Sequence, residues 1–131
     1  MTPKTSLQSF IQIFNLEEDA SKPGRVLSSA KIGNVYMSRS VISPGVVTGN
    51  SYHRDTQVMF YVERGDVSVV FEHTQTKEKK EFCMESDKTV IHIPSMVAHA
   101  TKNIGDKDAV LVFFSDRELR SEDRYSYILL A

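Results

Sequence analysis

Residues 45–65 read GVVTGNSYHRDTQVMFYVERG, and this stretch decides the fold that the sequence predicts. One turn signal, Ser43-Pro44-Gly45, leads into it, and a second, Arg64-Gly65-Asp66, closes it. Between the turns, Val58–Val62 is a nearly continuous apolar run, which is typical of a buried strand. Asp66–Phe71 follows at once with the composition of a strand, so we expect the two strands to pair as a hairpin.

The strand-turn-strand pattern continues on both sides of this stretch. Further strands are predicted at Asn34–Ile42, Glu81–Met84, Thr89–Ile93, Val97–Asn103, Ala109–Ser115 and Tyr125–Leu130. Roughly eight short strands separated by turns predict an all-β sandwich or closed barrel. A barrel leaves few exposed strand edges and has a mouth where a small ligand binds.

The two ends of the chain are less regular. The apolar residues of Thr5–Leu16 fit a helical turn and an edge strand equally well, and Glu17–Gly24 reads as a polar loop. We therefore expect residues 1–24 to form an N-terminal arm or edge element and residues 25–131 to form the barrel. The charged segment Asp116–Arg124 suits a short helix or a loop. Apolar terminal strands favour a homodimer that exchanges strand edges, because an open edge invites pairing.

Composition narrows the class of protein. The chain has 131 residues and a formal net charge of −1, so nothing in its charge favours nucleic acid or an anionic membrane as a partner. No apolar run approaches the roughly 20 residues that cross a bilayer, and Met1–Ile13 lacks the pattern of a signal peptide. We expect a cytoplasmic protein. The single cysteine, Cys83, is expected to be a small buried hydrophobe in a strand.

The spacing of residues 45–65 resembles the first motif of the cupin superfamily. That motif runs Gly, five residues, His, one residue, His, three or four residues, Glu, six residues, Gly. This chain keeps every interval with Gly45, Ser51, His53, Val58 and Gly65, but replaces the first histidine and the glutamate.

A second cupin-like motif follows. The superfamily pattern ends Pro, one residue, Gly, two residues, His, three residues, Asn, and this chain has Pro94, Met96, His99 and Asn103 at those places. Only the glycine differs. The resemblance implies a single-domain cupin, which is a double-stranded β-helix or jelly-roll barrel.

The two motifs together predict an interior pocket around His53 and His99. Positions 51 and 53 lie two apart on a strand, so their side chains share one face, and His99 reaches the same space from a neighbouring strand. Metal-binding cupins use three histidines and one glutamate there. With only two of those ligands retained, no tightly bound cofactor is expected, although His53 and His99 would be the ligands of a divalent metal if one binds. Gln57 adjoins the glutamate position but faces the other way on a regular strand.

Two longer stretches are similar to sugar-modifying cupins. Thr48–Gln57 resembles the first motif of nucleotide-sugar 3,4-ketoisomerases. Ile93–Asn103 and Ser115–Leu129 are similar to the C-terminal cupin domain of capsular polysaccharide assembling proteins, which epimerises a UDP-linked 4-keto-6-deoxy sugar. The resemblance implies a nucleotide-sugar isomerase or epimerase in surface polysaccharide biosynthesis. Thr48 stands where the ketoisomerases carry an arginine.

These resemblances imply roles for individual residues. His53 is the expected base, since histidine titrates near neutral pH, and His99 is expected to orient the substrate carbonyl or act as a second acid. The proton donor is expected to be Ser51 or a tyrosine: Tyr52, Tyr61 or Tyr36. Arg39 and Arg54 are expected to contact the diphosphate, because arginine binds phosphate with two parallel hydrogen bonds. The other residues expected to contact a nucleotide sugar are Gln57, Tyr61 and Asn103.

Two other functions remain open from the sequence. One is a non-catalytic cupin that binds a small ligand such as a carbohydrate. The other is a metal-dependent enzyme that uses His53, His99 and a carboxylate outside the motifs, Glu63 or Glu72. The two remaining histidines are expected to lie outside the site. His73 adjoins a polar loop and is expected to be a packed or surface residue, and His92 is interpreted as structural.

Overall fold

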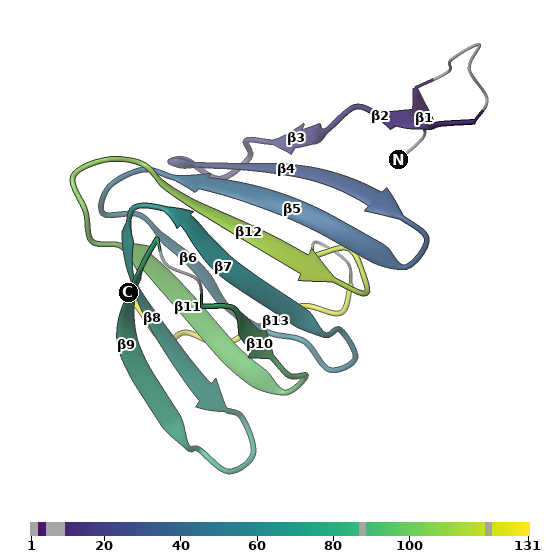
Figure 1. Cartoon of the computed structure of the whole chain (residues 1–131). Coiled ribbons are helices and arrows are strands. Elements are labelled where there is room, and N and C mark those ends of the chain that lie inside the picture. The colour runs from purple at the N-terminus through teal and green to yellow at the C-terminus, as the bar shows by residue number, and fades with distance from the viewer. Residues whose placement is uncertain (1–2, 5–9, 87–88, 120–121) are drawn as a thin grey trace.

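The computed structural model describes residues 3–4, 10–86, 89–119 and 122–131, and every regular element in these ranges is a strand (Figure 1). Most of the strands form two antiparallel sheets, which are packed against each other (Figure 1). The predicted all-β jelly-roll fold is confirmed. None of the described residues forms a helix that could cross a membrane.

Six strands make the larger sheet: β10 (Ile91–Ile93), β7 (Val58–Arg64), β12 (Ala109–Ser115), β5 (Val35–Ile42), β4 (Arg25–Ile32) and β3 (Glu17–Asp19), in that spatial order. Five strands make the smaller sheet: β13 (Tyr125–Ser126), β6 (Val47–Tyr52), β11 (Val97–Asn103), β8 (Asp66–His73) and β9 (Lys79–Glu85), again in spatial order. A separate pair joins β1 (Pro3–Lys4) and β2 (Ile13–Phe14).

The predicted hairpin between β7 and β8 is wrong. The two strands lie in different sheets, β7 between β12 and β10, and β8 between β11 and β9. Gly65 makes the crossover with a φ of 93°, and a Cβ on it would lie only 2.9 Å from the Cα of Ala109. A glycine is therefore needed both for the left-handed backbone and for the close approach.

The same crossover explains the core. On β7 and β8, apolar residues at alternate positions face the space between the two sheets. From β7 come Phe60 and Val62, and from β8 come Val67 and Val69, all at most 2% exposed. The apolar residues of β7 and β8 therefore pack against each other between the two sheets, and do not lie side by side on one face of a hairpin.

The ends of the chain differ from the expectations in part. The final strand is only Tyr125–Ser126, instead of Tyr125–Leu130, and the described part of Asp116–Arg124 contains no helix. Within Thr5–Leu16, residues 5–9 lie outside the described residues, while Ile13–Phe14 is a strand. β1 and β2 project beyond the sandwich (Figure 1), and the Phe10 side chain is 83% exposed.

The expectation for Cys83 is wrong, because its side chain is exposed. It lies on the edge strand β9, where Met84, the next residue, is buried and Phe82, the one before, contacts Phe71. Alternation along the strand turns Cys83 to the outer face of the sheet.

Candidate functional site

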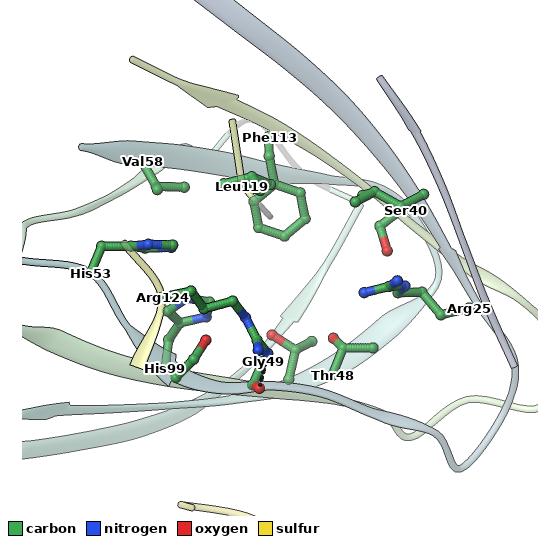
Figure 2. Close-up of a pocket in the computed structure, with 13 residues that line it drawn as sticks. Arg25, Ser40, Thr48, Gly49, His53, Val58, His99, Phe113, Leu119 and Arg124 are labelled. Carbon is green, nitrogen blue, oxygen red and sulfur yellow. Dashed lines mark hydrogen bonds between the residues drawn. The ribbon is translucent and has the colours of Figure 1, made fainter. Parts of the chain in front are cut away.

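A cavity of about 80 Å³ lies between the two sheets, with room for only a few water molecules or one small chemical group (Figure 2). One end carries His53 and His99, and the other carries Arg25. Apolar side chains such as Val58, Phe113 and Leu119 form part of the wall. Most of the remaining wall is polar, from Ser40, Thr48, Ser51 and Thr101.

The two motif histidines lie side by side at one end of this cavity (Figure 2). Their ring centroids are 6.4 Å apart and their planes differ by 30°. His99 lies on β11 directly opposite Ser51 on β6, and His53 follows the last residue of β6. The structure therefore brings together Ser51, His53 and His99, as the sequence predicted.

A bulge in β6 makes this arrangement possible. The register between β6 and β11 shifts between His99 and Ala100, which pair with Ser51 and Gly49 and leave Asn50 as the extra residue. Gly49 has a φ of 90°, and a Cβ on it would come within 2.8 Å of the His99 carbonyl oxygen. Glycine at this position therefore allows β6 to pass close to His99.

His53 is oriented by the C-terminal segment. The ring is 5% exposed, and its Nδ1 lies 2.5 Å from the backbone oxygen of Asp123. A carbonyl oxygen can only accept, so Nδ1 carries the proton and donates it. In neutral His53 the other ring nitrogen, Nε2, is then the basic one.

The Asp123 carboxylate ties the same segment to the loop after His53. Its oxygens accept hydrogen bonds from the backbone N–H groups of Arg54, Asp55 and Thr56 at 2.9–3.0 Å and from the Thr56 hydroxyl at 2.8 Å. Burial alone would raise the pKa of Asp123, but these hydrogen bonds outweigh it and lower the pKa to about 2. Asp123 is therefore a carboxylate at neutral pH.

His99 is neutral at physiological pH. Burial in the cavity wall is the main cause that lowers the pKa of His99 to about 4, and the neighbouring His53 and Arg124 add to it. A neutral imidazole still donates one N–H, so His99 is suited to hydrogen-bonding a substrate oxygen. It is less suited to the predicted role of a second acid, because its charged form is scarce at neutral pH.

The ligand set of a metal-binding cupin does not fit this cavity. Ser51 and Val58, each 2% exposed, occupy two of the four ligand positions, and an aliphatic side chain cannot coordinate. Among the described residues there is no group of three or more His, Cys, Asp or Glu side chains that could hold a metal ion. The carboxylates of the metal-enzyme alternative lie elsewhere: Glu63 pairs with Arg39, and Glu72 accepts a hydrogen bond from Tyr127.

Several predicted contact residues lie outside the cavity. Arg39 is half exposed, with its guanidinium 3.5 Å from Glu63. Arg54 lies over the ring of Tyr125, 4.3 Å from its centroid. Asn103 is buried, and its side chain bonds to the backbone of Ile42, Gly105 and Lys107. Its amide therefore stabilises a turn, where the sequence predicted a substrate contact.

Strand alternation turns Tyr52 and Tyr61 away from the cavity, whereas Tyr36 shares the inward face of β5 with Ser40 but lies four residues away along the strand. Tyr52 follows Ser51, so it points outward and stacks on Tyr125 with ring centroids 5.4 Å apart. Tyr61 lies between Phe60 and Val62, two core residues, and is not part of the cavity wall. Tyr36 likewise lies outside the cavity wall, beside Lys31.

The structural interpretation of His92 and the outward orientation of Gln57 agree with the structure. The Gln57 side-chain oxygen lies 2.7 Å from Nε2 of His92, and both residues are exposed. His73, the other histidine outside the cavity, accepts hydrogen bonds from the backbone of Gln75 and Thr76 at the loop tip. Neither histidine lines the cavity.

Sequence reasoning missed three residues of the site. Arg25 enters from the first strand after the arm, and Asp123 and Arg124 come from a segment that is irregular and charged. Arg124 is exposed beside the cavity and donates a hydrogen bond from Nη2 to the Gly49 carbonyl oxygen at 3.0 Å (Figure 2). No periodicity marks such a segment, so only the similarity of Ser115–Leu129 to the capsular proteins pointed to it.

The family assignment comes from a match to residues 25–127, which covers the sandwich, the cavity and the segment with Asp123. The matching family model is described as the polysaccharide biosynthesis C-terminal domain. The chain belongs to this family. A comparison of this polysaccharide biosynthesis C-terminal domain with curated protein sequences found no match.

Solved structures with a fold similar to this polysaccharide biosynthesis C-terminal domain include the two bacterial proteins that follow. The capsular polysaccharide assembling protein CapF from Staphylococcus aureus has 23% identity and a TM-score of 0.78, over 94% of this chain and 37% of that one. Bacillus subtilis oxalate decarboxylase has 17% identity and a TM-score of 0.71, over 84% and 30% of the two chains. At these identities the likeness establishes the fold. The domain spans a little over a third of the length of CapF.

Proposed function

We propose that this domain is a nucleotide-sugar isomerase or epimerase of polysaccharide biosynthesis, acting on a 4-keto-6-deoxyhexose. The family and the likeness to CapF support the biosynthetic context. One observation carries the chemistry: Nδ1 of His53 donates to the Asp123 carbonyl oxygen, which leaves Nε2 as a base. His99 and Ser51 complete the group of polar side chains at that end of the cavity.

The proposed reaction is a proton transfer at the carbon beside the ketone. Nε2 of His53 removes the proton, and the electron pair of the C–H bond moves to the ketone oxygen to form an enolate. The N–H of neutral His99 or the hydroxyl of Ser51 donates to that oxygen. The charged imidazolium keeps its hydrogen bond to Asp123. Return of a proton to the same carbon from the opposite face gives an epimer. If the hydroxyl on that carbon instead passes its proton to the enolate oxygen, protonation of the former ketone carbon gives an isomer, with the ketone moved to the neighbouring carbon.

The cavity is too small for a whole nucleotide sugar. A volume of about 80 Å³ accommodates part of the sugar, so the nucleotide lies outside. Arg124, exposed beside His99 and Gly49, is the cation of the cavity wall nearest that end and is proposed to contact the diphosphate.

The partner proposal is a second copy of the chain. Apolar side chains on the arm are exposed, with Ile11 49% and Ile13 44% exposed. Such side chains favour association, and we expect the arm to pack on a second subunit in a homodimer.

The proposal is tested by incubating the protein in heavy water with UDP- and dTDP-linked 4-keto-6-deoxyhexoses and following the ring protons by NMR. We expect the proton signal beside the ketone to disappear only when the protein is present, because enolisation exchanges that proton with solvent. Binding of these sugars without any exchange would contradict catalysis and favour the non-catalytic alternative.

A further inference from the structure

The side chain of Arg25, at the end of the cavity away from the histidines, has a buried nitrogen without a hydrogen-bond partner. Its guanidinium points into the cavity from β4 (Figure 2), and its side chain is 17% exposed. Nη2 lies 3.1 Å from the Asp19 carboxylate. The Nε atom, however, is buried and has no hydrogen-bond partner, and no other buried side-chain nitrogen or oxygen of the described residues shares this condition.

A buried N–H without a partner is costly, so its presence beside a cavity suggests a ligand that completes it. The surrounding wall also carries hydroxyl groups, from Ser40, Thr48 and Thr101. We propose that the Arg25 end is a subsite for the hydroxyl groups of the sugar, with Nε–H of Arg25 donating to one of them. The inference rests on the proposed function for the class of ligand.

The charges at this end favour a neutral group over a phosphate. Asp19 compensates the charge of Arg25 through their ion pair. A neighbouring groove shares Leu27 and Leu119 with the cavity, and its wall includes Glu17, Glu18, Asp19 and Glu118. A diphosphate would be repelled by these carboxylates, whereas uncharged hydroxyls would not.

The two ends of the cavity therefore define one orientation for the substrate. The hydroxyls lie at Arg25, the carbon beside the ketone lies near His53, and the diphosphate leaves past Arg124. An arginine N–H bonded to a sugar hydroxyl adds specificity, because a ligand without that hydroxyl leaves the buried donor unpaired.

The test compares the affinities of UDP and of a UDP-linked 4-keto-6-deoxyhexose, measured by calorimetry. The dissociation constant for UDP divided by that for the UDP-sugar isolates the contribution of the sugar to binding. In Arg25→Met we expect this ratio to fall about tenfold from the wild-type value, with the affinity for UDP unchanged. Arg25→Lys, which retains the charge beside Asp19 but lacks Nε–H, is expected to lose the sugar contribution too, and it guards against a folding defect in the methionine variant.

Arg39→Met is the matched control. Arg39 also pairs with a carboxylate, Glu63, but lies outside the cavity, so its ratio should equal that of the wild type. A wild-type ratio in folded Arg25→Met or Arg25→Lys would overturn the subsite, and so would equal affinities for UDP and the UDP-sugar in the wild type. Because the readout is binding, a failure of the solvent-exchange test would overturn the catalytic proposal alone.

Discussion

His53→Gln is expected to lower the rate of solvent exchange beside the ketone by about a hundredfold or more, which is the usual contribution of a general base. Glutamine has nearly the size of histidine and can still donate to the Asp123 carbonyl oxygen, which in the wild type lies 2.5 Å from Nδ1. It has no basic nitrogen, so the carbon-bound proton has no acceptor. The measurement is the loss of the ring-proton NMR signal in heavy water with a UDP-linked 4-keto-6-deoxyhexose.

The matched control is His92→Gln. His92 is exposed, bonds to Gln57 and does not line the cavity, so its loss should leave the exchange rate within about twofold of wild type. Exchange at the wild-type rate in folded His53→Gln would remove His53 from the mechanism.

Asp123→Asn is expected to destabilise the protein by about 2 kcal/mol at pH 7, with slower exchange as a consequence. The lowered pKa of Asp123, from 3.8 to about 2, corresponds to about 2 kcal/mol of folding free energy. Oδ2 alone accepts three hydrogen bonds, from Asp55 and Thr56. An amide offers only one oxygen, so its NH₂ group would face donors and the carbonyl that orients His53 would shift. Urea denaturation measures the change.

The pH dependence of this effect has a definite sign. Because the pKa of Asp123 is lower in the folded than in the unfolded state, its contribution is complete above pH 3.8 and is lost as the pH falls towards 2. The destabilisation by Asp123→Asn should therefore shrink on acidification through this range. Asp116→Asn is the control: Asp116 accepts from the Gln57 N–H at the other end of the same loop but is exposed and does not contact His53. An equal loss of stability in both variants would contradict the account of Asp123.

The sequence predicted the fold more completely than the site. The intervals from Gly45 to Gly65 and from Pro94 to Asn103 identified the jelly roll, because they reflect strand lengths and turns that the fold requires. The hairpin expected at Gly65 was wrong for a physical reason. Local composition specifies a strand and a turn, but the decision between pairing and crossing to the other sheet depends on contacts with distant residues such as Ala109.

Strand alternation separates the contact residues that the structure brings together from those that it does not. Ser51 and His53 face the cavity, while Tyr52 between them and Tyr61 on β7 do not. Alternation in the sequence excludes Gln57 from the metal site, and the same alternation accounts for the outward Tyr52 and Tyr61. Arg25 and Asp123 were beyond such reasoning, since the first acts across the sandwich and the second acts through its backbone oxygen.

The central claim is that the cavity lined by His53 and His99 binds the ligand. It is tested most directly by NMR of protein with ¹⁵N-labelled histidines at pH 7, to which a UDP-linked 4-keto-6-deoxyhexose is added. We predict that the ring signals of His53 and His99 shift on binding, while those of His73 and His92, which lie outside the cavity, stay in place. Binding that leaves the His53 and His99 signals unchanged, or that shifts only the outer pair, would contradict the account.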